Sequence, residues 1–143
     1  MSATLREFRD QDYGVVVRLW RDAGLTVKPS DTPPELRKLI DRNPGLFLVA
    51  EEGGSICGTV IGAWDGRRAW IYHLAVLPAL QGRGIGRMLM EELERRLRTV
   101  GATKLNLLVE RDNASVADFY RTLGYAPDEL LFMTKGLTPD PAA

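Results

Sequence analysis

One stretch decides the fold: Leu74-Ala-Val-Leu-Pro-Ala-Leu-Gln-Gly-Arg-Gly-Ile-Gly-Arg-Met-Leu89. The apolar run that ends at Val76 predicts a buried strand, and Pro78 ends it because proline has no N–H for a sheet ladder. Three glycines follow, and a helical pattern begins among them. Glycines between a strand and a helix let several backbone N–H groups converge at the positive end of the helix dipole. The stretch therefore predicts a cradle for phosphate groups.

Two common phosphate-binding patterns do not match this loop. It lacks the Gly-Lys-Ser/Thr ending of a nucleotide P-loop, and its glycines are not spaced Gly-x-Gly-x-x-Gly as in dinucleotide-binding domains. Taken alone, the loop leaves open an ordinary glycine-rich turn, so the rest of the chain must decide.

The composition indicates a soluble globular protein. The chain has 143 residues, of which 45% are hydrophobic and 27% charged, and its formal net charge is zero. This length predicts one domain, which we place at 1–137, with 138–143 as a flexible tail. The balanced charge gives no reason to expect a nucleic-acid or membrane partner.

The cysteine and histidine counts narrow the chemistry further. Cys57 is the only cysteine and His73 the only histidine, so an intrachain disulfide and a Cys- or His-rich metal site are excluded. We expect no metal. The first twelve residues carry five charges and do not resemble a signal peptide, so we expect a cytoplasmic location.

The hydrophobic periodicity predicts a mixed α/β order. The first half predicts a strand at 4–8, then a helix, and then a short helix at 35–40. Asp10 or Asp12 can cap the first helix, and its apolar face consists of Val16, Leu19, Trp20 and Ala23. Strands at 46–51, 55–63 and 67–76, joined by tight turns, predict an antiparallel meander. Next come a helix at 84–100, a strand at 103–110, a helix at 114–123 and a strand at 130–135. The helical crossover makes the 103–110 strand parallel to the one before it.

Two motifs in this order resemble a known family. The loop reads Gln81-x-x-Gly84-x-Gly86, and a second segment reads Asn113-Ala-Ser-Val-Ala-Asp-Phe-Tyr120-Arg-Thr-Leu-Gly124-Tyr125. Together they resemble the GCN5-related N-acetyltransferase (GNAT) superfamily over essentially the whole chain, with some likeness to the branch that acetylates ribosomal-protein N-termini. The resemblance implies the GNAT α/β fold, a mostly antiparallel sheet with a splayed parallel pair and about four flanking helices.

The resemblance also implies an acyl donor and the residues that hold it. The expected activity is transfer of an acetyl group from acetyl-CoA to a primary amine of a small molecule or a peptide. The donor's diphosphate would meet the loop, and its pantetheine arm would pair with the strand edge. The implied binding residues are Leu74, Ala75, Val76, Gln81, Gly82, Arg83, Gly84, Ile85, Gly86, Arg87 and Asn113. The alternative for Arg83 and Arg87 is solvent exposure, and Asn113 could equally cap the following helix.

The catalytic assignment is less complete. Tyr120 matches the family's tyrosine acid, with a core aromatic as the alternative reading. The glutamate base of the ribosomal-protein branch falls at Leu108 here, so that role cannot be carried over. His73, Glu110 or a water chain stay open as the base.

Several alternatives remain open from the sequence. Glu51 and Asp65 are second-rank candidates for the base. A CoA-binding sensor or interaction module on the same fold is the alternative to an enzyme. The acceptor amine, the acyl-chain preference and the oligomeric state, including a homodimer, have no readable signature.

Overall fold

The computed structural model describes residues 2–109 and 114–138. The chain divides into two compact units, Met1–Leu108 and Val109–Ala143. The first unit contains β1 (Thr4–Glu7), α1 (Tyr13–Asp22), α2 (Pro33–Arg42), β2 (Phe47–Glu52), β3 (Ser55–Trp64), β4 (Ala69–Val76), α3 (Ile85–Thr99) and β5 (Leu105–Asn106), with short 3-10 helices η1 (Asp10–Asp12), η2 (Pro29–Asp31) and η3 (Pro78–Leu80). The second unit contains α4 (Ala114–Thr122). No described helix combines the length and the apolar character needed to cross a membrane.

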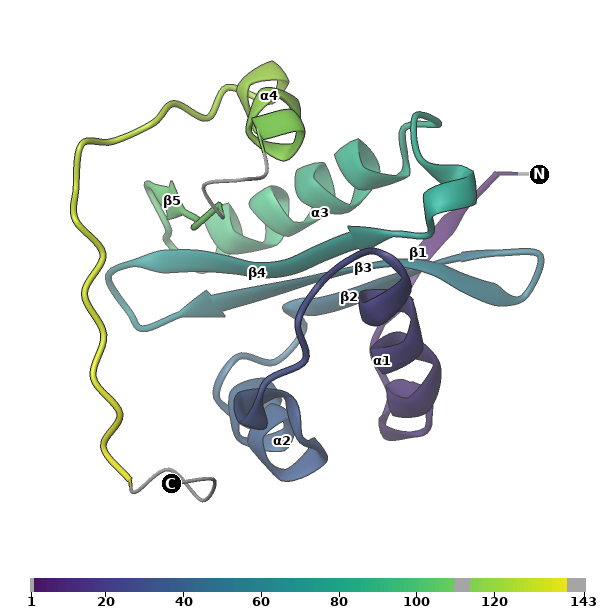
Figure 1. Ribbon diagram of the computed structural model, residues 1–143, viewed down its shortest axis with the longest axis horizontal. Helices are drawn as coiled ribbons and strands as arrows, with labels where there is room; N and C mark the ends of the chain where they lie inside the picture. Colours follow the sequence, from purple (N-terminus) through teal and green to yellow (C-terminus); the bar gives the residue numbers. More distant parts are fainter. Residues whose placement is uncertain (1, 110–113, 139–143) are drawn as a thin grey trace. The chain divides into compact units, whose positions relative to one another are not determined.

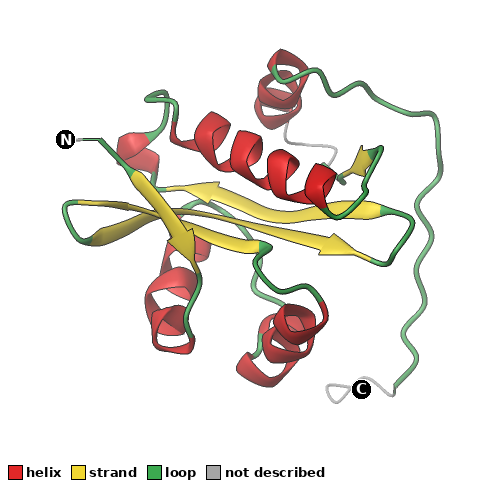
Figure 2. Cartoon of the chain, turned by 180° about the vertical axis from the view of Figure 1, so that it is seen from behind, coloured by secondary structure: helices red, strands yellow, loops and turns green. Residues whose placement is uncertain are grey.

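The first unit is built on a five-stranded sheet in the order β1-β2-β3-β4-β5 (Figure 1, Figure 2). Neighbouring strands from β1 to β4 are antiparallel, and β5 is parallel to β4. Gly53 and Gly54 make the tight turn between β2 and β3 with φ of 60° and 81°, a region that glycine enters without strain. The predicted meander and the predicted parallel pair are both confirmed.

Helices cover both faces of this sheet. Figure 1 shows α1 and α2 on one face and α3 on the other. Val16, Leu19 and Trp20 of the predicted α1 stripe are buried, and Ala23 is partly buried. Trp20 packs in a core cluster with Phe47 and Ile61. On the opposite face, Gly62 lets α3 lie close to β3, because a Cβ there would stand 2.6 Å from Cδ1 of Leu93.

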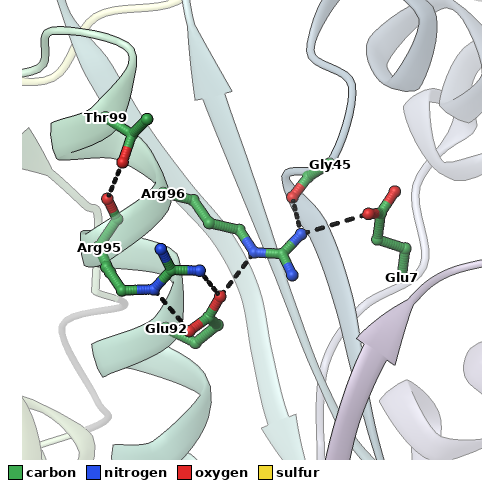
Figure 3. Close-up of polar contacts among 6 residues, drawn as sticks. All are labelled: Glu7, Gly45, Glu92, Arg95, Arg96 and Thr99. Atoms are coloured by element: carbon green, nitrogen blue, oxygen red, sulfur yellow. Dashed lines mark hydrogen bonds and ion pairs between the residues drawn. The ribbon is translucent and has the colours of Figure 1, made fainter.

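Arg96 connects α3 to β1 and to the segment before β2 (Figure 3). Its Nη1 donates to the carbonyl of Gly45 at 2.8 Å and lies 3.4 Å from Oε2 of Glu7, while its Nε lies 2.8 Å from Oε2 of Glu92. Arg95 also binds Glu92, and hydrogen bonds from the two guanidinium groups lower the pKa of Glu92 to about 2. One guanidinium therefore joins α3, β1 and the segment before β2.

Two sequence predictions are wrong. The cap predicted at Asp10 or Asp12 is not made. Asp12 is the N-cap residue of α1 and forms no side-chain cap bond, because its Oδ2 instead accepts the N–H of Arg9 and the guanidinium of Arg6, each at 2.8 Å. Oδ1 of Asp10 accepts from the guanidinium of Arg37 at 2.6 Å. The segment 130–135 forms no strand. A strand needs a ladder partner, and the backbone bond described at that segment is a local one from Leu130 N to the carbonyl of Asp128.

The strand expected at 103–110 is shorter in the structure than in the prediction. It is confirmed only at Leu105–Asn106. Glu110 lies outside the described residues, as does the tail beyond 138.

Candidate functional site

The glycine loop connects β4 to α3. After η3, Gly82 and Gly84 adopt φ of 80° and 85°, and Gly84 is the N-cap residue of α3. These left-handed conformations favour glycine because a Cβ would meet the backbone. The predicted strand, glycine loop and helix are confirmed, with the helix beginning at Ile85.

The N-terminus of α3 suits an anion. Its N-cap residue, Gly84, has no side chain to cap it, and its first turn holds no acidic residue. The first N–H groups of a helix have no intrahelical partner and carry the positive end of the dipole. Apart from the glycine's own backbone, its chain neighbours and the adjoining helix backbone, no described atom lies within 4 Å of a Cβ built at Gly82 or Gly84, so the loop's surface is open. Open N–H groups at a positive helix end fit a diphosphate.

The loop's side chains are already engaged within the protein. Gln81 donates from Nε2 to the carbonyl of Val76 at 3.1 Å, which ties the loop to the end of β4. Arg83 lies 3.4 Å from a carboxylate oxygen of Glu52, and Arg87 lies 3.5 Å from one of Glu91. Because both predicted cations pair with carboxylates, the backbone is the stronger candidate for anion binding.

One edge of β4 is unpaired along most of its length. β5 pairs with it only at Ala69 and Trp70. From Ile71 to Val76, no strand among the described residues lies against that edge. An open edge of N–H and C=O groups can hold an extended, amide-rich ligand, and Leu74, Ala75 and Val76 lie on it.

A bulge interrupts β4 opposite β3. Thr59 pairs with Ala75 and Ile61 with Tyr72, so two residues of β4 face one of β3. One of them, His73, has φ of 49° and is the only non-glycine residue with positive φ among those described. An extra residue of this kind re-aims side chains next to it.

The ring of His73 belongs to a polar network. Its Nε2 lies 2.8 Å from Oδ1 of Asp31, whose side chain is buried and whose Oδ2 accepts the N–H of Lys28 at 2.9 Å. Thr59 donates from Oγ1 to the carbonyl of His73 at 3.0 Å and accepts the indole N–H of Trp20 at 2.9 Å. The Trp20 ring centroid lies 4.5 Å from that of His73. Three elements therefore fix this residue.

Tyr120 lies in α4, within the second unit. It is buried, and burial raises the pKa of its phenol to about 12. The rings of Phe119 and Tyr125 meet it edge-on at 5.5 Å and 5.8 Å. Asn113, the other predicted residue of this segment, lies outside the described residues.

Comparison with known proteins decides the family. The pattern of the Acetyltransferase (GNAT) family matches residues 6–125. The chain belongs to the GNAT acetyltransferase family. An acetyltransferase of Yersinia enterocolitica is 35% identical over 95% of this chain and 96% of its own length. The expected family and its acetyl-CoA-dependent acetyltransferase activity are thereby confirmed.

Solved structures agree with this fold. Ard1 from Thermoplasma volcanium matches with a TM-score of 0.79 and 25% identity, over 88% of this chain and 84% of that one. The PaiA N-acetyltransferase from Thermoplasma acidophilum, solved in complex with coenzyme A, matches with a TM-score of 0.80 and 20% identity, over 91% and 93%. The GNAT arrangement predicted from the order of elements is confirmed.

The remaining base candidates of this GNAT chain have other partners. Glu51 forms an ion pair with Arg6. Asp65 accepts the N–H groups of Arg67 and Arg68, each at 2.7 Å, and these bonds lower the pKa of its carboxyl. Both carboxylates therefore have structural roles in this fold.

Sequence reasoning missed the partners of His73. Asp31 precedes it by 42 residues, in an irregular stretch next to prolines. Trp20 and Thr59 read as ordinary core and strand positions. No local pattern connects these three residues, and only the folded register brings them to one ring.

Proposed function

We propose that this protein acetylates a primary amine of a small molecule or a peptide, with acetyl-CoA as donor. The observation that carries the proposal is the uncapped, open N-terminus of α3 directly after the unpaired edge of β4. A diphosphate suits the open helix N-terminus, and an amide-rich arm suits the unpaired strand edge. The family's defining chemistry, N-acetyl transfer, supports an amine as the acceptor.

Each part of the donor has a counterpart in the chain. The backbone N–H groups of 82–87 bind the diphosphate, and the edge at Leu74–Val76 pairs with the pantetheine arm, with Asn113 as a further hydrogen-bonding group. The bound donor supplies an acetyl group activated as a thioester. A backbone N–H near Val76 stabilises the negative charge that develops on the acetyl oxygen.

Tyr120 takes the role of donor to the leaving sulfur. A phenol with a pKa of about 12 stays protonated at neutral pH, so it always has a hydrogen to offer. A thiol ionises near pH 8.5, and a hydrogen bond from the phenol stabilises the thiolate as it leaves. Tyr120→Phe keeps the ring and removes this donor.

A matched pair of loop variants tests donor binding. Asn and Asp both tolerate the left-handed backbone of position 84 better than other side chains. Only Gly84→Asp adds a negative charge where the diphosphate would bind. We expect it to raise the KM for acetyl-CoA about fivefold more than Gly84→Asn, which corresponds to about 1 kcal/mol. Equal KM values for the two variants would place the diphosphate elsewhere.

Turnover is tested by thiol release from acetyl-CoA across a panel of primary amines, including peptides with free N-termini. We expect at least one amine to be acetylated, and Tyr120→Phe to lower kcat about 10²-fold or more with little change in the KM for acetyl-CoA. Saturable binding of acetyl-CoA without turnover on any amine would support the CoA-binding sensor instead.

A further inference from the structure

The side of β4 that carries His73 is the face covered by α1 and α2 (Figure 1). Residues directly paired in an antiparallel ladder point to the same face. Tyr72 pairs with Ile61, and Ala75 pairs with Thr59, so both share the face on which Trp20 packs. His73 also contacts Trp20.

The bulge places two consecutive side chains on one face. In a regular strand, Tyr72 and His73 would point to opposite faces. Here both lie on the α1 side, and Tyr72 is 43% exposed while the side chain of His73 is 21% exposed. An imidazole on this face is thus accessible beside the unpaired edge of β4.

The neighbouring carboxylate sets the orientation of the imidazole. Nε2 of His73 lies 2.8 Å from Oδ1 of Asp31, so the neutral ring holds its proton on Nε2 and donates it to the carboxylate. Nδ1 then carries the free lone pair. Nδ1 makes no hydrogen bond to any residue that the structure describes. A carboxylate that holds one nitrogen and leaves the other free is the arrangement of an oriented base.

The backbone at this position stores strain. A non-glycine residue in the left-handed region costs of order 1–3 kcal/mol and persists only where its surroundings hold it. At His73, Asp31 holds the ring and Thr59 holds the backbone carbonyl through hydrogen bonds. A glycine would occupy position 73 without this cost, so the backbone conformation of the histidine costs the fold free energy that a glycine would not.

These observations lead to one assignment, which rests on the proposed amine acetylation. We propose that His73 is the catalytic base that takes the proton from the acceptor nitrogen, and that Asp31 is its positioning residue. In this step, the neutral amine nitrogen bonds to the acetyl carbon while the carbon–sulfur bond breaks and its electron pair leaves with sulfur. The nitrogen's proton passes to Nδ1 of His73, and the imidazolium returns it to solvent.

Few titratable groups surround this ring among the described residues. η2 contributes Asp31, and α1 contributes Tyr13, whose hydroxyl donates to the Asp31 carbonyl at 2.9 Å. Tyr72 precedes it on β4, and burial raises the pKa of that phenol above its usual value of 10. Thr59 from β3 and Trp20 from α1 do not titrate. Variants at His73 and Asp31 therefore test the proposed proton transfer in this part of the protein.

Two substitutions separate base chemistry from structure. His73→Asn tolerates a left-handed backbone and can still donate to Asp31, but it cannot accept a proton near neutral pH. His73→Gly relieves the strain and leaves room for free imidazole. With the amine identified in the panel, we expect both to lower kcat about 10²-fold or more, and free imidazole to restore His73→Gly at least tenfold. His73→Asn should not respond to imidazole, because its side chain fills the space.

The pH profile distinguishes the base from a merely structural residue. Wild-type kcat should rise with pH as the catalytic base loses its proton, and both variants should lack that rise. The amine's own titration appears in all three proteins and cancels in the comparison. Full kcat with an unchanged profile in His73→Asn, while the wild type turns over, would overturn this assignment and leave the proposed function intact. Absence of turnover in the wild type would instead refute the proposed function.

A measurement without any acceptor tests the geometry itself. Because the chain has a single histidine, its two ring nitrogens give unambiguous signals in long-range proton–nitrogen NMR spectra. We expect the neutral ring of the wild type to be the Nε2–H tautomer, and a mixed tautomer in Asp31→Asn. An Nδ1–H tautomer in the wild type would leave no lone pair on Nδ1 for the acceptor and would overturn the proposal.

Discussion

The contact between Gly62 and Leu93 offers a quantitative test of how α3 packs on the sheet. A Cβ at position 62 would stand 2.6 Å from Cδ1 and 3.3 Å from Cδ2 of Leu93, which is fully buried. Gly62 lies outside the left-handed region, so Gly62→Ala adds a steric cost and no backbone strain. The methyl must displace Leu93 or the helix that carries it.

The size of the effect follows from this geometry. Overpacking of this kind costs about 1–3 kcal/mol, and Leu93→Ala alone should cost about 2–5 kcal/mol through lost burial and a cavity. In the double variant the added methyl enters the space that Leu93 leaves. We therefore expect Gly62→Ala with Leu93→Ala to cost at least about 1 kcal/mol less than the sum of the two single changes.

Urea unfolding measures these free energies, with the slope of each transition compared to check that the unfolded states are alike. Gly66→Ala is the matched control, because Gly66 has φ of 96° and open space around its Cβ. It should destabilise by about 1–2 kcal/mol through strain alone, and with Leu93→Ala the two costs should add to within about 0.5 kcal/mol. Additive costs for the Gly62 pair as well would refute the close packing of α3 on β3.

Three further substitutions address the polar contacts. Arg96→Ala should lower the free energy of unfolding in urea by about 1–2 kcal/mol because the link from α3 to β1 and to the segment before β2 is lost. A loss below about 0.3 kcal/mol would show that the link is not stabilising. Arg6 lowers the pKa of Asp12, so their ion pair stabilises the folded state above pH 4, and this stabilisation is lost as Asp12 is protonated on acidification. In thermal unfolding, Asp12→Asn should therefore destabilise the protein at pH 7 and progressively less below pH 4. An equal loss of stability at pH 3 would contradict this. Thr59→Val leaves the indole N–H of Trp20 unpaired and should lower the free energy of unfolding in urea by about 1–3 kcal/mol. Thr59→Ser keeps the hydroxyl oxygen and should lower it less. A larger loss for Thr59→Ser than for Thr59→Val would contradict the Trp20–Thr59 hydrogen bond.

Features with a local physical cause were predictable from the sequence. The apolar stripe of α1 follows helical spacing, and Gly53-Gly54 specifies a tight turn, so both could be placed without knowing the rest of the fold. The glycine loop was predictable for the same reason, since its conformation and its open N–H groups depend on its own residues. Its side chains were not, because the carboxylates that engage Arg83 and Arg87 come partly from another element.

Two failures show where local reasoning stops. Asp12 has the right residue type and position for a helix cap, but the guanidinium of Arg6 and the N–H of Arg9 use its carboxylate instead. The segment 130–135 has the composition of a strand, and Leu130, Leu131, Phe132 and Met133 are 64–81% exposed. Composition can favour an extended backbone, but only a ladder partner makes it a strand.

The orientation of His73 shows a third limit, and the proposed catalytic base depends on it. Strict alternation along β4 would put Tyr72 and His73 on opposite faces, and would put Tyr72 and Ala75 on opposite faces as well. The observed register pairs Tyr72 and Ala75 with two residues of the same face, which is possible only with one extra residue between them. That extra residue turns the imidazole toward Asp31 and Trp20. Among the residues that the structure describes, no strand pairs with the other edge of β4 over this stretch. A single irregularity in the sheet therefore places an oriented imidazole beside the backbone that is proposed to hold the acyl donor.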